Sequence, residues 1–393
     1  MRSLSSRGIR LKTLALLGAV ALAASACGGT GHATSATTTT LAVPPSLVGY
    51  VTLIGTGSAL GTGNGVRALD LSEGPGGPQR AFSVGNFPDA AAVSPDGKTL
   101  YVTNYSSNSV TPIDVATGRA GKDISVGSGP AGIAIAPDGK TAYVTNAGTS
   151  PIGTTVTPIN LKTKKALPPI AVGAGPQGIA ITPDGKTAYV ADAGGIVTGQ
   201  NAPLGHTVTP IDLSTGAPGA AIQVGNAPLG IAISPDGSTV YVANSGSGSV
   251  TPISVAGNAA GVPISVNGSP QALAATGSTL YVADDASTPA GNNLTAISIS
   301  TGTAGKSVTL GAGPSSVAIS PDGSTAYVVC NGAGQVVPVD LASGTVMKSS
   351  TITVGGGPYA LALVTVPASK VARALAVPAS PKGTSGASGA SGK

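Results

Sequence analysis

Short apolar runs alternate with turn residues along most of the chain, and the same pattern returns many times. The clearest copy is GIAIAPDGKTAYVTN, residues 132–146, in which two runs of small and β-branched apolar residues flank Pro-Asp-Gly. Such runs bounded by Gly, Pro and Asp predict β-strands joined by tight turns. Seven of the nine tyrosines occupy one position in successive copies, 40 to 52 residues apart: Tyr50, Tyr101, Tyr143, Tyr189, Tyr241, Tyr281 and Tyr327.

Each copy predicts four strands. The first is typified by residues 132–135, the second contains the tyrosine, the third is typified by residues 110–114, and the fourth ends in a pair such as Val126-Gly127. Pro-Asp-Gly joins the first two strands, because proline pre-sets φ at the second turn position and glycine accepts a positive φ. One carboxylate per turn falls short of the six or more oxygens that calcium binds, so we assign the aspartates of this motif to turns. They are Asp96, Asp138, Asp184, Asp236 and Asp322.

Four strands per unit and seven units predict an all-β fold, a seven-bladed β-propeller of four-stranded antiparallel blades over residues 46–367. The first unit lacks a first strand before Tyr50, whereas residues 357–366 read as a first strand with no unit after it. We therefore expect the N- and C-terminal strands to complete one blade and close the ring. Prolines inside five of the third strands predict a bulge or an edge, because proline lacks a ladder donor.

The tyrosine segments, such as Tyr101-Val102-Thr103-Asn104 and Tyr143-Val144-Thr145-Asn146, closely resemble the YVTN-family β-propeller repeat. This family occurs in bacterial and archaeal extracytoplasmic and surface-layer proteins and is related to lactonase-like propellers. The resemblance covers roughly residues 48–366, and six of the seven copies are clear. It implies a propeller outside the cytoplasm, and it suggests a lactonase-like hydrolase or a surface-layer protein as possible functions.

The N-terminus predicts export. Residues 1–26 combine a basic start, an apolar run over residues 14–24, and small residues before Cys27. That run is shorter than the roughly 20 apolar residues that a membrane-spanning helix needs. Small residues before a cysteine resemble the bacterial lipobox, although Ala24 stands where that motif prefers leucine. We predict a lipoprotein signal peptide and lipidation of Cys27, with simple cleavage of the signal as the alternative.

The flanking segments and the charge distribution support this picture. Residues 27–45 have the Thr- and Gly-rich composition of a flexible tether, and residues 368–393 form a Gly/Ser/Ala tail for which we expect no regular structure. The protein is thus expected to be lipid-anchored on the outer side of the cytoplasmic membrane. Although the whole chain carries +5, residues 41–367 hold 12 basic and 15 acidic residues, a net charge of −3. We expect no nucleic-acid partner, because no basic stripe is available to follow phosphates.

Length variation points to one face of the propeller. It falls almost entirely in the connections between the second and third strands, and alternating strand direction places these on one face with the connections from each fourth strand to the next unit. We expect this face to bind an unidentified protein, cell-envelope or small-molecule ligand. Its long connections are residues 52–65, 146–155, 192–207 and 284–293.

Polar residues at the ends of the second strands are the ligand-binding candidates at that face. They are Asn104, Asn146, Asp192, Asn244, Asp284, Asp285 and Asn331. Around a central mouth, these side chains would coordinate a cation or hydrogen-bond a ligand. The alternative, which we favour, is that they cap strand ends through Asx turns.

Catalytic groups are scarce. The two histidines, His32 and His206, lie in the tether and in a predicted loop, so no histidine cluster for a metal forms. Cys330 stands alone and is expected to be a small buried apolar residue. We assign no catalytic residue, metal or cofactor, and we predict a monomeric, non-catalytic binding or scaffold module. The alternatives are a lactonase-like hydrolase using Asp192, Asp284 and Asp285, and a surface-layer structural protein.

Overall fold

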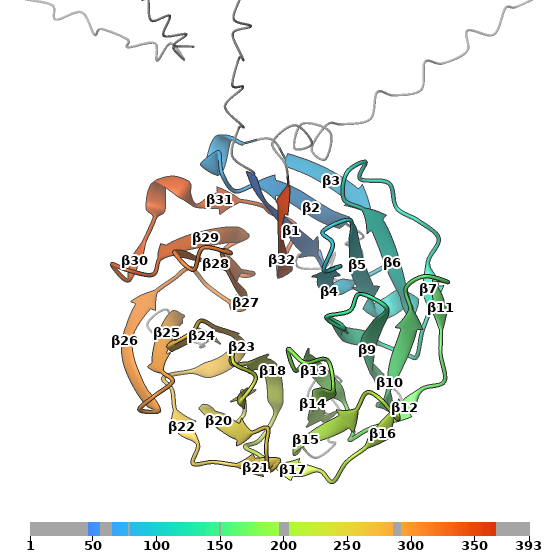
Figure 1. The fold of residues 1–393 in the computed structure, drawn as a ribbon. Helices are drawn as coiled ribbons and strands as arrows, with labels where there is room; N and C mark the ends of the chain where they lie inside the picture. Colours follow the sequence, from blue (N-terminus) through green and yellow to red (C-terminus); the bar gives the residue numbers. More distant parts are fainter. Residues whose placement is uncertain are drawn as a thin grey trace, which may run out of the picture. The chain divides into compact units, whose positions relative to one another are not determined.

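The structure is a computed structural model that describes residues 46–55, 65–77, 79–148, 151–195, 204–285 and 292–366. These residues form seven antiparallel sheets arranged as blades around an axis, which confirms the predicted propeller (Figure 1). The helices described are three 3-10 turns, η2 (Gly74–Gly76), η3 (Tyr105–Ser107) and η6 (Lys348–Ser350). Within the described ranges, no helix has both the length and the apolar character needed to cross a bilayer.

The blades share one order of strands from the axis outward. The innermost strands are β32 (Pro358–Val366), β4 (Pro88–Val93), β8 (Pro130–Ile135), β13 (Pro176–Ile181), β18 (Pro228–Ile233), β23 (Ser269–Ala275) and β27 (Pro314–Ile319). The second strands are β1 (Ser46–Leu53), β5 (Thr99–Asn104), β9 (Thr141–Gly148), β14 (Thr187–Gly194), β19 (Thr239–Asn244), β24 (Thr279–Asp285) and β28 (Thr325–Cys330). The third strands are β2 (Gly65–Asp70), β6 (Ser109–Asp114), β10 (Ile152–Asn160), β15 (Leu204–Asp212), β20 (Ser249–Ser254), β25 (Asn293–Ser298) and β29 (Gln335–Asp340).

The outermost strand is continuous in only two blades, as β3 (Gln79–Ser83) and β26 (Thr303–Thr309). In the other blades it is reduced to short pieces: β7 (Ile124–Ser125), β11 (Lys165–Ala166), β12 (Ile170–Ala171), β16 (Ala217–Pro218), β17 (Ile222–Gln223), β21 (Ala259–Ala260), β22 (Ile264–Ser265), β30 (Thr345–Val346) and β31 (Ile352–Thr353).

Proline in the third strand explains these interruptions. In β10, Pro158 has no N–H to give to the outer strand, and its carbonyl accepts the N–H of Leu167 at 2.8 Å in the gap between β11 and β12. The equivalent prolines are Pro112, Pro210, Pro252 and Pro338, and each blade that carries one has a divided or shortened outer strand. Ala68 and Ala296 replace the proline in the two blades with a continuous outer strand. The outer strand therefore breaks where the ladder loses its donor.

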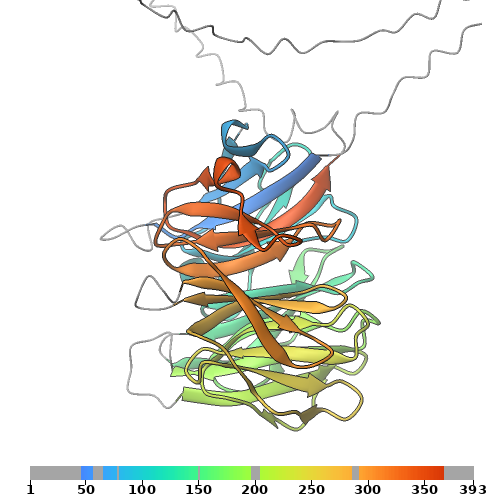
Figure 2. The same ribbon diagram turned by 90° about the vertical axis from the view of Figure 1, so that its left-hand side faces the viewer.

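Closure of the ring joins the two ends of the propeller. β32 pairs antiparallel with β1, so that Tyr50 faces Ala362 and Ser46 faces Val366. The blue β1 and the red β32 lie side by side in both views (Figures 1 and 2). The first blade thus takes its innermost strand from the end of the chain and its other strands from the beginning, as the sequence predicted.

The hydrophobic core is divided among the seven interfaces between blades. Seven buried clusters are present among the described residues, each built from two neighbouring blades. The cluster between the first two blades, for example, packs Tyr50 and Phe82 against Leu100 and Ile113. Both faces of each blade are covered, which explains why the second strands are apolar on both sides.

Near the axis, adjacent blades approach so closely that glycine is required. A Cβ on Gly178 of β13 would overlap the carbonyl oxygen of Leu229 on β18. Threonine hydroxyls join the innermost strands at the same level. The Thr103 hydroxyl accepts the N–H of Ala90 in its own blade at 2.8 Å and donates to the carbonyl of Ala131 in the next blade at 2.7 Å. This bridge gives the third residue of the repeated Tyr-Val-Thr-Asn segment a structural role.

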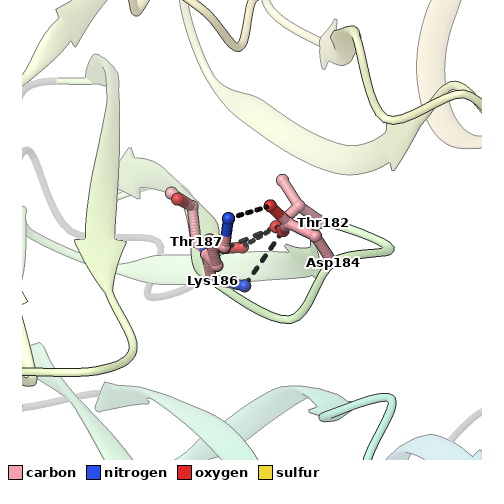
Figure 3. Close-up of polar contacts among 4 residues, drawn as sticks. All are labelled: Thr182, Asp184, Lys186 and Thr187. Atoms are coloured by element: carbon pink, nitrogen blue, oxygen red, sulfur yellow. Dashed lines mark hydrogen bonds and ion pairs between the residues drawn. The ribbon is translucent and has the colours of Figure 1, made fainter.

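The Pro-Asp-Gly segments form turns held by their aspartates, as predicted. In the turn between β13 and β14, the Asp184 carboxylate accepts the Thr182 hydroxyl at 2.6 Å and the Lys186 backbone N–H at 3.0 Å (Figure 3). The Thr182 hydroxyl in turn accepts the N–H of Thr187 at 3.1 Å. The hydrogen bond from Thr182, followed by that from Lys186, lowers the pKa of Asp184 below its usual value. The carboxylate is thus used within its own turn.

Removing β32 is predicted to open the ring. Deletion of residues 357–393 exposes the edge of β1 and removes Leu361, Ala362, Val364 and Val366 from two interface clusters. Losing these apolar contacts is expected to cost several kcal/mol, enough to abolish the cooperative thermal transition. Deletion of residues 382–393 alone serves as the control and is expected to leave the melting temperature unchanged. An unaltered transition in the larger deletion would contradict the closure.

Gly178→Ala is predicted to lower the free energy of unfolding by about 1–3 kcal/mol, because the added methyl group forces two backbones apart. Gly277→Ala is the matched control, since a Cβ at Gly277 meets no atom within 4 Å. Urea denaturation of the two variants measures the difference. Equal stabilities would show that the innermost strands are not packed as tightly as described.

Candidate functional site at the axial mouth

A cavity of about 160 Å³ opens at the axis, at the start of the innermost strands. Each blade contributes to it the residue that follows the first proline of its innermost strand. These residues are Asp89, Ala131, Gln177, Leu229, Gln271, Ser315 and Tyr359. The proline recurs in all seven blades, whereas the residue after it changes from blade to blade. The repeat therefore supplies a constant frame with a variable lining.

In six of the seven blades, a residue with positive φ just before the proline brings the lining residue to the axis. The residue before the proline is glycine in four blades, for example Gly175 with φ of 60° and Gly313 with φ of 69°. In the blade that contains β4, the residue before the proline is Phe87, with φ of 52°. A bulky residue in the left-handed region costs on the order of 1–2 kcal/mol, so Phe87 is held there against its own preference.

Asp89 is the acidic residue of the cavity. Its side chain is 9% exposed, and burial raises its pKa to about 7. Within the described part of the chain, no hydrogen bond or ion pair reaches its carboxyl group, although its backbone carbonyl accepts the Thr52 hydroxyl at 3.3 Å. The Nε2 atom of Gln177 is likewise buried, and no hydrogen-bond partner for it lies among the described residues. The cavity thus presents an acceptor and a donor that the fold itself does not use.

Two further polar residues complete the lining. Tyr359 is 39% exposed, and the negative charge of Asp89 is the main cause that raises the pKa of its hydroxyl. The Ser315 hydroxyl donates to the Tyr359 carbonyl at 2.7 Å. Gln271 donates to the carbonyl of Ser269 at 3.1 Å and to the hydroxyl of Ser245 at 3.3 Å, which fixes its amide at the rim.

The candidate ring at the ends of the second strands lies one layer outside this cavity. Asn104, Asn146 and Asn244 are buried, and each amide donates to two hydroxyls on the third strand of its own blade. For Asn104 the acceptors are Ser109 at 3.1 Å and Thr111 at 2.8 Å. None of these amides is among the residues that line the axial cavity.

Asp192 and Asp284, the two aspartates of this ring, occupy equivalent positions in their own blades. Asp192 accepts the hydroxyls of Thr207 at 3.1 Å and Thr209 at 2.7 Å, and Asp284 accepts that of Thr295 at 2.6 Å. Burial raises the pKa of Asp192 to about 6 and that of Asp284 to about 7. They are thus held in separate blades, each by its own third strand.

The last two ring candidates lie at the strand ends. Asp285 is half-buried at the end of β24, opposite Ser269 of β23. The amide of Asn331 donates to the carbonyl of Pro358 at 2.9 Å and so ties the seventh blade to β32. Of the long connections predicted on this face, residues 56–64, 149–150, 196–203 and 286–291 lie outside the described residues.

Other candidates from the sequence are placed as follows. His206 lies exposed on β15 and not in a loop, because β14 and β15 extend beyond the length of the usual repeat. Cys330 is buried in an interface cluster, and burial raises its pKa to about 11, which keeps the thiol protonated. Among the described residues, no three His, Cys, Asp or Glu side chains come together to hold a metal ion. Cys27, His32 and both flanking segments lie outside the described residues.

Comparison with known proteins extends the fold assignment. No protein-family model and no curated protein matches the chain. Among solved structures, the Pseudomonas aeruginosa periplasmic gluconolactonase is 21% identical with a TM-score of 0.65, over 82% of this chain and 100% of its own. A putative 6-phosphogluconolactonase from Bacteroides uniformis is 16% identical with a TM-score of 0.65, over 81% and 99%. The Kuenenia stuttgartiensis hydrazine synthase is 24% identical with a TM-score of 0.61, over 71% and 95%. At these identities the similarity establishes the β-propeller fold.

Replacing Asp284 by asparagine is predicted to stabilise the protein at alkaline pH. Because the pKa of Asp284 is about 7 in the fold, the folded protein keeps a proton that the unfolded chain loses near pH 4. Stability therefore falls as pH rises from about 4 to about 7, and Asp284→Asn removes this part of the loss, on the order of 4 kcal/mol. Asn244 shows that an amide fits the same position in another blade.

Urea denaturation of wild type and Asp284→Asn at pH 5 and pH 8 measures this effect. Asp96→Asn is the control, because the Asp96 carboxylate is exposed in its turn and hydrogen bonds lower its pKa. It is expected to destabilise the protein slightly at both pH values. A stability difference for Asp284→Asn that does not change with pH would contradict the buried, protonated carboxyl.

Proposed function

We propose that the protein is an extracytoplasmic propeller of the YVTN type that binds a ligand at its axial mouth without catalysing a reaction. The observation that carries the proposal is the axial cavity, in which seven equivalent positions hold chemically different side chains. A purely structural ring of repeats has no need for an acid, two amides, a hydroxyl and a phenol at one constant position. Differences confined to one position of a rigid frame are typical of a recognition site.

The proposed cellular location rests on the N-terminal sequence. Residues 1–26 resemble a lipoprotein signal, and Cys27 is the proposed site of lipid attachment. The protein then acts on the outer side of the cytoplasmic membrane, with residues 27–45 as its tether.

Lactonase-like hydrolysis is the second candidate. Two of the solved structures to which the chain is similar are named as gluconolactonase or putative 6-phosphogluconolactonase. Asp89 adds a specific observation, since a buried carboxyl group with a pKa near 7 is suited to general acid–base catalysis. Binding is preferred because the cavity holds no second carboxylate or histidine beside Asp89 among the described residues.

Binding at the mouth is tested by a thermal-shift screen of the purified full chain with amines, amino acids, polyols and sugar lactones. We expect one class to raise the melting temperature of the wild type. The Gln177→Ala/Gln271→Ala variant is expected to bind that class about tenfold more weakly, because two hydrogen bonds are lost. Leu167→Ala, an exposed change outside the mouth, is the control. A shift that persists in the double variant would place binding elsewhere.

Hydrolysis is tested on the same lactones by titrating released acid. We expect no turnover by the wild type. Turnover that disappears in Asp89→Asn would establish a lactonase at the axis, because a carboxamide cannot act as a base. Turnover that disappears only when Asp192, Asp284 and Asp285 are all replaced by Asn would assign the chemistry to the ring residues.

Lipid attachment is tested by growing the expressing bacterium with radiolabelled palmitate. We expect the wild-type protein to carry the label and Cys27→Ala to lose it, since the thiol is the proposed acceptor. Cys330→Ala is the matched control and is expected to retain the label, because Cys330 is buried in the propeller. Equal labelling of wild type and Cys27→Ala would refute the anchor.

A further inference from the structure

The aromatic residues of this chain are unevenly placed. Of nine tyrosines and two phenylalanines, seven tyrosines occupy the repeated position on the second strands. The remaining four are Phe82, Phe87, Tyr105 and Tyr359, and Phe82 packs in the core against Tyr50. Of the other three, Tyr359 lines the cavity with Asp89, Phe87 lies two residues before Asp89, and Tyr105 packs against Phe87. The aromatic residues that neither the repeat nor the core accounts for thus lie on β32, directly before β4, and on η3, which contacts β4.

Phe87 and Tyr105 form a supported pair. Their rings are 5.7 Å apart between centroids and inclined at 52°, and the Tyr105 N–H donates to the Phe87 carbonyl at 2.8 Å. The Tyr105 hydroxyl donates to the carbonyl of Gly148 in the next blade at 3.2 Å, which holds the ring in place. Phe87 occupies a positive-φ position that four of the other blades give to glycine. The side chain is therefore kept at a position where its backbone is strained.

Tyr359 contributes the third aromatic ring, from β32 at the C-terminal end of the propeller. It follows the first proline of β32, lines the cavity with Asp89, and is among the most exposed large apolar residues of the described chain. The charge of Asp89 raises the pKa of Tyr359 and, after burial, that of Tyr105, so both hydroxyl groups lie within its electrostatic reach. Among the residues that the structure describes, no lysine or arginine forms an ion pair with Asp89.

We infer that the corner of the mouth where β4 lies beside β32 binds an organic ammonium ion, with Asp89 as the counter-charge and the ring of Tyr359 against its alkyl groups. The pair of Phe87 and Tyr105 supports the strand start that carries Asp89. A buried carboxylate without a partner is unfavourable, and a cation relieves that cost. The faces of aromatic rings attract cations through their quadrupoles. A metal ion fits the corner poorly, because calcium needs six or more oxygen ligands and one carboxylate is present. This inference rests on the proposed function, because it names the ligand class for the same mouth.

The test uses butylammonium and tetramethylammonium as probes, with butanol as the neutral comparison, in calorimetric titrations of the purified full chain. We expect both ammonium ions to bind at least about tenfold more tightly than butanol. Asp89→Asn keeps the shape of the side chain and is expected to remove this preference. Asp96→Asn, on the turn of the same blade, is expected to leave it unchanged.

The aromatic contribution is tested separately. Tyr359→Leu is expected to weaken binding of tetramethylammonium by roughly threefold to tenfold, whereas Tyr359→Phe, which keeps the ring, is expected to retain it. Because Tyr359 is partly exposed, neither change should disturb folding. Equal weakening by Leu and Phe would refute the role of the ring.

The outcomes separate the ligand class from the proposed function. Equal binding of butanol and butylammonium, or an unchanged preference in Asp89→Asn, would overturn the ammonium site. If ammonium ions fail to bind while another class binds at the mouth, the inference fails and the proposed function stands. If the Gln177→Ala/Gln271→Ala variant shows no loss for any class that binds, the proposed function fails as well.

Discussion

The antiparallel pairing of β32 with β1 is the interaction on which the rest of the structure depends. Each blade covers its neighbours, so the two interface clusters on either side of the first blade are incomplete until the first and last units meet. The pairing lets β32 contribute Leu361, Ala362, Val364 and Val366 to two of the clusters at once. It also positions Tyr359 beside Asp89, so the closure that stabilises the ring also assembles the mouth. One strand, β32, thus contributes both to the closure of the ring and to the candidate site.

The axis imposes the second constraint. Seven strands converge there, so that Gly178 has no room for a side chain and the Thr103 hydroxyl bridges two backbones. The polar ring one layer out is explained by the same crowding, because Asn104 and its equivalents use their amides to join the second and third strands. At the level of the mouth, room for a variable side chain exists where the innermost strands begin.

Much of the fold could be predicted from the repeats. The spacing of the tyrosines gives the number of blades, and the missing strand before Tyr50 gives the closure. The aspartates of the Pro-Asp-Gly turns, such as Asp184, were also assigned to their turns from the motif. These features repeat, and repetition is what makes a pattern visible in a single sequence.

The axial site could not be predicted in the same way, because its lining residues differ from blade to blade. Asp89 and Tyr359 share one position in their blades, yet nothing in their types reveals this until the proline before each is aligned. The polar residues that do repeat, such as Asn146, are visible in the sequence, and the structure places them within the blades. The sequence does contain a useful signal: a constant proline followed by a residue of changing chemistry, together with three aromatic residues outside both the repeat and the core.

The register of β1 and β32 also determines on which face of the propeller each end of the pair lies. Tyr359 near the start of β32 is at the mouth, and Val366 at its end is paired with Ser46, so the chain enters and leaves the propeller side by side on the opposite face. Ser46 and Val366, the two ends of the described propeller, are thus neighbours on the face away from the mouth. A ligand at the mouth therefore meets neither end of the described propeller.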